Sequence, residues 1–248
     1  MRAENIGLVG VAEELRELLA MSKSAREFCH RFLLSCLTSS KGCTVNELFS
    51  VQSFIIARIV RSQEALELLL KEGFSIEAAV VALSQFELCL DVLYIDGNVQ
   101  RATKWIGHDS KRYQPWKVTD KINEVYRLDR KRKDAQYKIF EMLSSVKHGN
   151  PTASGFGFPI RTEGRKVSVI TGEIDDPFAL SYKLTICGFC TCQLLEALEG
   201  VKRAFSKFIN IDNGLCKELA HLLQESKRKM AQIMHHIDMV EDVLKNTA

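Results

Sequence analysis

Apolar residues recur every three or four positions along most of the chain up to Gly149, which is the periodicity of amphipathic helices. The clear stretches lie at about 11–37, 44–73, 75–95 and 119–146, with a short helix ending near Trp105. The stretch 75–95 is apolar on most sides, which predicts the central helix of a bundle. The stretch 119–146 is either one helix or is broken near Arg127 to Lys133.

A different pattern follows. Residues 149–177 hold three of the four prolines and include an alternating run at 166–170, which predicts a small β-hairpin insertion at about 155–172. Two long helices are then expected within about 177–245, the first beginning at Pro177 and the second near Leu215.

The last helix carries an apolar stripe at spacings of three and four, interrupted by Ser226. Such a stripe is typical of a coiled-coil seam, which would make this helix a homodimer interface. A helix that packs on its own bundle shows the same pattern, so both interpretations remain open.

These patterns predict an all-α fold, a bundle of six or seven helices in one domain over residues 1–248. The net charge of +3 is small for this length and does not by itself indicate nucleic acid. The N-terminus lacks the pattern of a signal peptide, and no run of about 18 uncharged apolar residues occurs. We therefore expect a cytoplasmic protein without a membrane span, whose eight cysteines stay reduced.

Neither a metal nor a cofactor is predicted. Cys187, Cys190 and Cys192 lie within one apolar helix and point in different directions, whereas a structural zinc site needs four convergent ligands. Their redox role stays open. The acidic group at 173–176 suits a solvated loop as well as a divalent ion.

The best candidate for chemistry is the segment 137–151, which reads YKIFEMLSSVKHGNP. On a helix, Tyr137, Ser144 and His148 share one face, and His148 lies at the C-terminal end, where the helix carbonyls favour a cation. An acid–base pair acting on a phosphate is one interpretation. The other is a helix C-cap whose histidine completes local hydrogen bonds.

Part of the chain, from Arg58 to Pro151, resembles a family of uncharacterised bacterial helical proteins. The matching residues are Arg61, Glu64, Ala65, Leu69, Gly73, Ala78, Glu87, Tyr94, Ala102, Tyr137, Leu143, Ser144 and His148. Leu83 stands where that family usually has an arginine paired with the helix glutamate. The resemblance implies a helical fold and a polar network of Arg61, Glu87, Tyr94, Tyr137 and Ser144 in the bundle interior, with His148 beside it. Such a network either fixes helix register or forms a site.

A second resemblance concerns the HEPN (higher eukaryotes and prokaryotes nucleotide-binding) ribonucleases, helical proteins with an arginine and a histidine a few residues apart. Arg228 and His235 are similar to that pair and would lie two turns apart on one solvent-facing side of a helix. The resemblance implies metal-independent RNA cleavage at these residues or at His148. A solvated helix face explains the same spacing.

A basic run is the best signal for nucleic acid, because arginine and lysine neutralise phosphates and tyrosine stacks on bases. It consists of Arg127, Arg130, Lys131, Arg132 and Lys133. An exposed basic helix face without any nucleic-acid role is the alternative.

Two functions follow from these features. The first is a non-catalytic interaction or regulatory module that binds a protein partner, in a bacterial defence or stress setting. The second is a HEPN-like, metal-independent ribonuclease effector. No nucleophile, metal or phosphate-loop motif stands out in the sequence, which favours the first.

Overall fold

The computed structural model describes residues 2–40, 47–110, 115–148, 160–163, 166–169 and 177–247. The all-α class is confirmed. The helices are α1 (Arg2–Ser39), α2 (Glu47–Lys71), α3 (Ser75–Ile95), α4 (Val99–Ile106), α5 (Val118–Val125), α6 (Arg130–Lys147), α8 (Pro177–Phe205) and α9 (Asn213–Thr247), with a 3-10 turn, η1, at Gly107–Ser110. The described residues thus hold eight α-helices rather than six or seven.

The break between α5 and α6 accounts for part of this difference, and side-chain capping explains it. Asp129 accepts a hydrogen bond of 3.0 Å from the backbone N–H of Arg132, so a new helix begins there. Asn98 starts α4 in the same way by accepting from the N–H of Arg101 at 3.0 Å. Gly97, with φ of +69°, provides the left-handed turn that ends α3.

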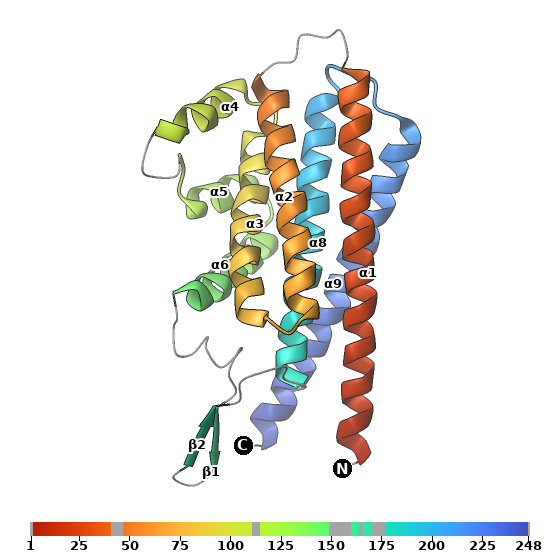
Figure 1. Ribbon diagram of the computed structural model, residues 1–248. Coiled ribbons are helices and arrows are strands. Elements are labelled where there is room, and N and C mark those ends of the chain that lie inside the picture. Colours follow the sequence, from red (N-terminus) through yellow and green to blue (C-terminus); the bar gives the residue numbers. More distant parts are fainter. Residues whose placement is uncertain are drawn as a thin grey trace.

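Five long helices, α1, α2, α3, α8 and α9, run side by side, while α4, α5 and α6 lie against α2 and α3 (Figure 1). α8 lies in the middle and contacts α1, α2, α3 and α9. The sequence predicts α3 at the centre of the bundle. α3 does contact α2, α4, α5, α6 and α8, but α8 is the more completely buried of the two helices. The two ends of the chain lie at the same end of the bundle (Figure 1).

Two helices are long and apolar enough to cross a membrane by length and composition, namely α3 and the stretch Leu180–Phe205 of α8. Within the bundle, 89% of the apolar window of α8 is buried, against 56% for α3. Packing inside the bundle accounts for the apolar composition of α8, so this observation is weak evidence for a membrane span.

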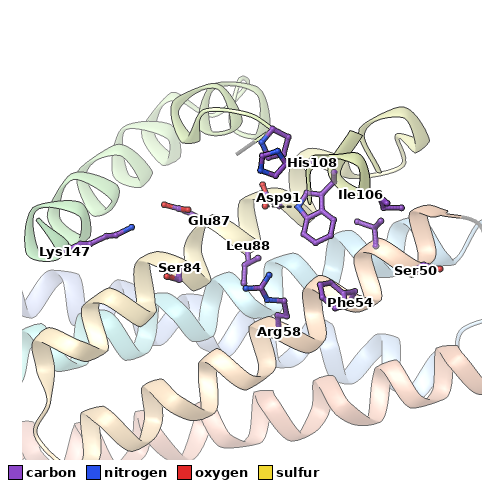
Figure 2. Close-up of a pocket in the computed structure, with 13 residues that line it drawn as sticks. Ser50, Phe54, Arg58, Ser84, Glu87, Leu88, Asp91, Ile106, His108 and Lys147 are labelled. Atoms are coloured by element: carbon purple, nitrogen blue, oxygen red, sulfur yellow. Dashed lines mark hydrogen bonds between the residues drawn. The ribbon is translucent and has the colours of Figure 1, made fainter. Parts of the chain in front are cut away.

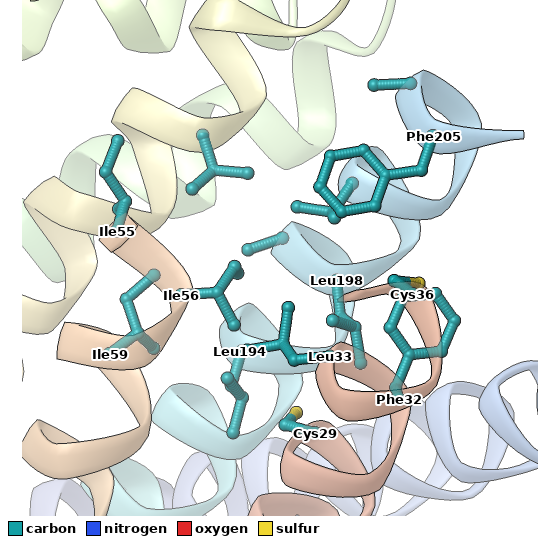
Figure 3. Packing of buried hydrophobic residues seen from close by; sticks show 14 of the residues in the cluster. Cys29, Phe32, Leu33, Cys36, Ile55, Ile56, Ile59, Leu194, Leu198 and Phe205 are labelled. Carbon is teal, nitrogen blue, oxygen red and sulfur yellow. The ribbon is translucent and has the colours of Figure 1, made fainter. Parts of the chain in front are cut away.

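The core consists of two apolar clusters. The first joins α1, α2 and α8 and includes Phe32, Ile56 and Leu198 (Figure 3), and within it the rings of Phe49 and Phe205 stack at 4.1 Å. The second cluster joins α3, α5, α6 and α8.

Gly188 lets α8 and α9 approach closely. A Cβ atom at this position would lie 3.1 Å from both Ile233 Cδ1 and Met230 Sδ of α9. The close contact between α8 and α9 at this position therefore requires glycine, which has no side chain.

A hydrogen-bonded polar chain crosses the centre of the bundle. Gln63 Nε2 of α2 donates to Ser22 Oγ of α1 at 2.7 Å, and Gln85 Nε2 of α3 donates to Gln63 Oε1 at 2.5 Å and to the carbonyl oxygen of Cys190 at 3.1 Å. Both glutamines are fully buried. Because the chain links four helices at defined positions, it fixes their register.

The segment expected to form a hairpin contains two four-residue strands, β1 (Ile160–Glu163) and β2 (Lys166–Val169). They pair antiparallel, with Ile160 opposite Val169 and Glu163 opposite Lys166.

Candidate functional site

A cleft of about 840 Å³ lies between α2, α3 and α4, close to the end of α6 (Figure 2). One face of α2, one face of α3 and the end of α4 form its walls. The lining residues are Ser50, Val51, Phe54, Arg58, Ser84, Glu87, Leu88, Asp91, Trp105, Ile106, His108, Pro115 and Lys147. Helical spacing explains the set, since the residues on α2 and on α3 recur three or four positions apart.

A buried ion pair supports one side of the cleft. Lys121 of α5, only 1% exposed, donates from Nζ to Asp91 Oδ1 of α3 at 2.7 Å and to the carbonyl oxygen of Glu87 at 3.4 Å. Trp105 Nε1 of α4 donates to Asp91 Oδ2 at 3.2 Å. Both oxygens of Asp91 are therefore engaged, and these bonds hold α4 and α5 against α3.

The wall formed by α2 and α4 is apolar and partly open to solvent. Phe54 is 55% exposed and Ile106 is 47% exposed, and the rings of Phe54 and Trp105 meet edge to face at 5.9 Å. Leu88 of α3 continues this surface. Exposed apolar side chains grouped beside polar ones are typical of a binding surface.

Two exposed cations reach the cleft from different helices. Arg58 lies one turn after Phe54 on α2, and Lys147 is the last residue of α6. In Figure 2 the side chain of Lys147 extends toward Glu87, and Arg58 lies beside Leu88. Across the described ranges, neither cation has a hydrogen bond or an ion pair. Both are available to a ligand that carries negative charge.

The residues predicted to form an interior network do not form one cluster. Arg61 is exposed on α2, whereas Glu87 lies in the cleft and is half-buried. Tyr94 is half-buried, with its ring 3.9 Å from the guanidinium of Arg101. Tyr137 donates its hydroxyl to the carbonyl oxygen of Thr119 at 3.2 Å.

Two members of the segment 137–151 have defined places at the end of α6. Ser144 is half-buried, and its carbonyl accepts the backbone N–H of His148 at 3.1 Å. His148 is exposed and is the C-cap of α6, as the structural interpretation predicts. Its neighbour Lys147 lines the cleft, while His148 does not.

The interior network that the structure does show, with Gln63 and Gln85 at its centre, is missed by sequence reasoning. The sequence did contain a sign of this network: in each of two neighbouring helices, one glutamine occupies a position that the helical periodicity assigns to the apolar face. The pair of Asp91, which lines the cleft, and Lys121, which supports it, is missed for another reason: the two residues lie on separate helices, 30 positions apart.

The basic run is divided by the fold. Arg127, Arg130 and Lys131 are exposed, and Lys133 is half-buried. Arg132 Nη2 donates to both carboxylate oxygens of Glu196 on α8, each at 2.6 Å.

Further contacts hold Arg132 and Glu196 in place. The guanidinium of Arg132 lies 4.9 Å from the ring centre of Tyr126, and Lys227 of α9 contacts Glu196 at 3.2 Å. Arg132 therefore joins α6 to the bundle, and the run does not present five free cations.

On α9, Arg228 and His235 are both exposed, and neither lines the cleft. Leu219, Ser226 and Ile233 of the predicted stripe are buried within one chain. This part of the stripe packs on its own bundle, as one of the two sequence interpretations expects. The homodimer stays a prediction.

The described cysteines are free and, apart from Cys216, buried. Burial raises the pKa of Cys187 to about 12 and that of Cys192 to about 11, and it raises the pKa of Cys190 further. These thiols stay neutral at physiological pH, which makes them poor nucleophiles and poor metal ligands. No group of three or more metal-binding side chains occurs among the described residues, and the acidic group at 173–176 lies outside them.

Comparison with known proteins finds no matching family model, no matching curated protein and no matching solved structure.

Proposed function

We propose that this protein is a non-catalytic interaction module that receives a segment of a protein partner in the cleft between α2, α3 and α4. The observation that carries the proposal is the pairing of Phe54, 55% exposed, with the exposed Arg58 one turn away on the same wall. An open apolar surface beside convergent polar groups is the usual form of a binding site.

The state of the polar groups in the cleft supports binding rather than catalysis. Asp91 and Lys121 are bonded to each other, and Trp105 occupies the second oxygen of Asp91. His108 has no hydrogen bond to any of the residues described, so no carboxylate among them orients its imidazole as a general base. The buried thiols offer no activated nucleophile.

A peptide selection tests this function. A displayed library of random 12-residue peptides is selected on wild-type protein and on Phe54→Ala. Phe208→Ala serves as the matched control, because Phe208 is also 55% exposed but lies outside the cleft. We expect enriched peptides to bind wild type and Phe208→Ala alike and to bind Phe54→Ala at least about fivefold more weakly, the scale of losing one buried aromatic anchor. Enrichment that does not depend on Phe54 would refute the proposal.

RNA cleavage is the competing function, and one observation favours it: Arg228 and His235 are both exposed on α9, two turns apart. The decisive assay incubates varied RNAs with wild type, His148→Ala and His235→Ala in EDTA. A binding module leaves the RNA intact in every sample. Cleavage that disappears in one folded variant would establish a metal-independent ribonuclease and identify its histidine.

A further inference from the structure

We infer that the segment bound in the cleft is acidic and amphipathic, with an apolar anchor and a carboxylate about one helical turn apart. The inference rests on the proposed function and specifies its partner. Phe54 and Arg58 carry it, because they are four residues apart on α2 and both face the cleft. One turn of helix rises about 5.4 Å, so a ligand that meets both side chains must present complementary groups at about that separation.

The charges of the cleft favour an anionic ligand once the internal pairs are taken into account. Asp91 is 13% exposed and is paired with Lys121, so its negative charge is compensated inside the protein. Arg58 and Lys147 approach from α2 and α6 and have no such pairing among the described residues. A ligand carboxylate placed beside either cation supplies the counter-charge.

Glu87 restricts where the ligand can carry its negative charge. It lines the cleft on α3, and in Figure 2 Lys147 extends toward it, whereas Arg58 lies beside Leu88. A carboxylate next to Glu87 would be repelled, so the acidic groups of the ligand must be few and must face the two cations. This pattern suits a peptide, in which each side chain differs from the next.

A nucleic acid fits these contacts less well. Its backbone carries a charge at each nucleotide, and a strand crossing the cleft would pass Glu87. The indole of Trp105 is held by Asp91 and packed edge to face on Phe54, whereas base stacking needs an open ring face. The apolar wall accepts an aliphatic or aromatic peptide side chain directly.

The test compares peptide selections on two charge variants of the whole chain. Arg58→Glu/Lys147→Glu reverses the cleft cations. Lys71→Glu/Lys217→Glu, the control reversal, alters two exposed cations outside the cleft that have no hydrogen bond or ion pair among the described residues, and it changes the net charge by the same amount. Random 12-residue peptides are selected on wild type and on both variants, and enriched peptides are then synthesised with each Glu or Asp replaced by Gln or Asn.

We expect peptides enriched on wild type to combine aspartate or glutamate with an apolar residue three or four positions away. The cleft reversal should raise their Kd at least about tenfold, because each site exchanges an attraction for a repulsion, while the control reversal changes the Kd by less than about twofold. Replacing the peptide acids should weaken binding to wild type and strengthen binding to the cleft reversal, because the repulsion between the peptide acids and the two introduced glutamates is removed.

Failure of this inference differs from failure of the proposed function. Peptides that depend on Phe54 but show no acidic excess and no response to the cleft reversal would overturn the inference and leave the binding function standing. A 20-nucleotide poly(U) RNA that displaces the peptides and depends more strongly on Arg58 and Lys147 would assign the cleft to nucleic acid instead. Selection without any dependence on Phe54 would remove both proposals.

Discussion

Replacing Lys121 by methionine tests whether the cleft depends on its buried ion pair. Lys121 is 1% exposed, and its ammonium contacts Asp91 Oδ1 at 2.7 Å and the carbonyl oxygen of Glu87 at 3.4 Å. Methionine keeps an unbranched chain of nearly the same length and removes only the charge. The apolar packing of α5 on α3 is thereby largely preserved.

The expected loss follows from what remains around Asp91. Trp105 Nε1, at 3.2 Å, would be its one remaining donor among the described residues, and breaking a buried pair on one side costs about 3–5 kcal/mol. Because the Asp91 side chain is 13% exposed, water reaches it partly, so the lower end, about 3 kcal/mol, applies. For a chain of this size, that loss lowers Tm by about 6–12 °C.

Urea unfolding followed by circular dichroism and by the fluorescence of Trp105 and Trp116 measures this loss. Lys217→Met is the control, since Lys217 is exposed, and its effect should stay within about 0.5 kcal/mol. Lys121→Met/Asp91→Leu should be more stable than Lys121→Met, because it removes the uncompensated carboxylate. A loss below about 1 kcal/mol for Lys121→Met, or a less stable double variant, would refute the reasoning.

Three further predictions concern the core. Gln52 and Gln63 both lie on α2 and are fully buried. Both side-chain polar atoms of Gln52 lack a partner among the described residues, whereas Gln63 bonds to Ser22 and Gln85. Gln52→Leu should therefore stabilise the fold by about 1–2 kcal/mol, and Gln63→Leu should destabilise it by about 1–3 kcal/mol. Urea midpoints that move in the same direction would contradict both predictions. The third concerns Cys187, whose pKa burial raises from 9.0 to about 12. Above pH 9 the thiol of the unfolded chain releases its proton, whereas the thiol of the folded protein keeps it. The contribution of Cys187 to the free energy of unfolding is therefore fully present below pH 9. It is lost as pH rises toward 12, by about 1.4 kcal/mol per pH unit. In Cys187→Ala the free energy of unfolding should fall less steeply between pH 9.5 and 11, by about 1.4 kcal/mol per pH unit. An equally steep fall in the variant would show that burial of Cys187 does not cause it.

Much of the secondary structure could be predicted because its signals are local. The turn residues near Gly73 and Gly97 mark helix ends that the structure reproduces within a few residues, whereas α1 begins at Arg2, well before the start near residue 11 that the periodicity predicts. The end of α6 at His148 was predictable for the same reason. In each case the interacting groups lie within one or two turns of the chain.

The choice of central helix could not be made in this way. α3 and α8 are both long and apolar, yet α8 is buried more completely because four long helices pack around it. Apolar periodicity shows that a helix has a buried face, but it does not show how completely neighbouring helices cover the rest of its surface.

The candidate site shows the same division between local and tertiary information. The sequence by itself determined that the fold is all-α, where most of the helices lie along the chain, and that His148 lies at the end of α6. The tertiary structure decided which polar residues meet: it joined Asp91 to Lys121 across 30 positions and Gln85 to Cys190 across 105, and it bound Arg132 to Glu196. It also brought Phe54, Arg58 and Lys147 to one cleft. The physical reason is that helix formation depends on neighbours along the chain, whereas these contacts depend on which helix faces pack together and at what register.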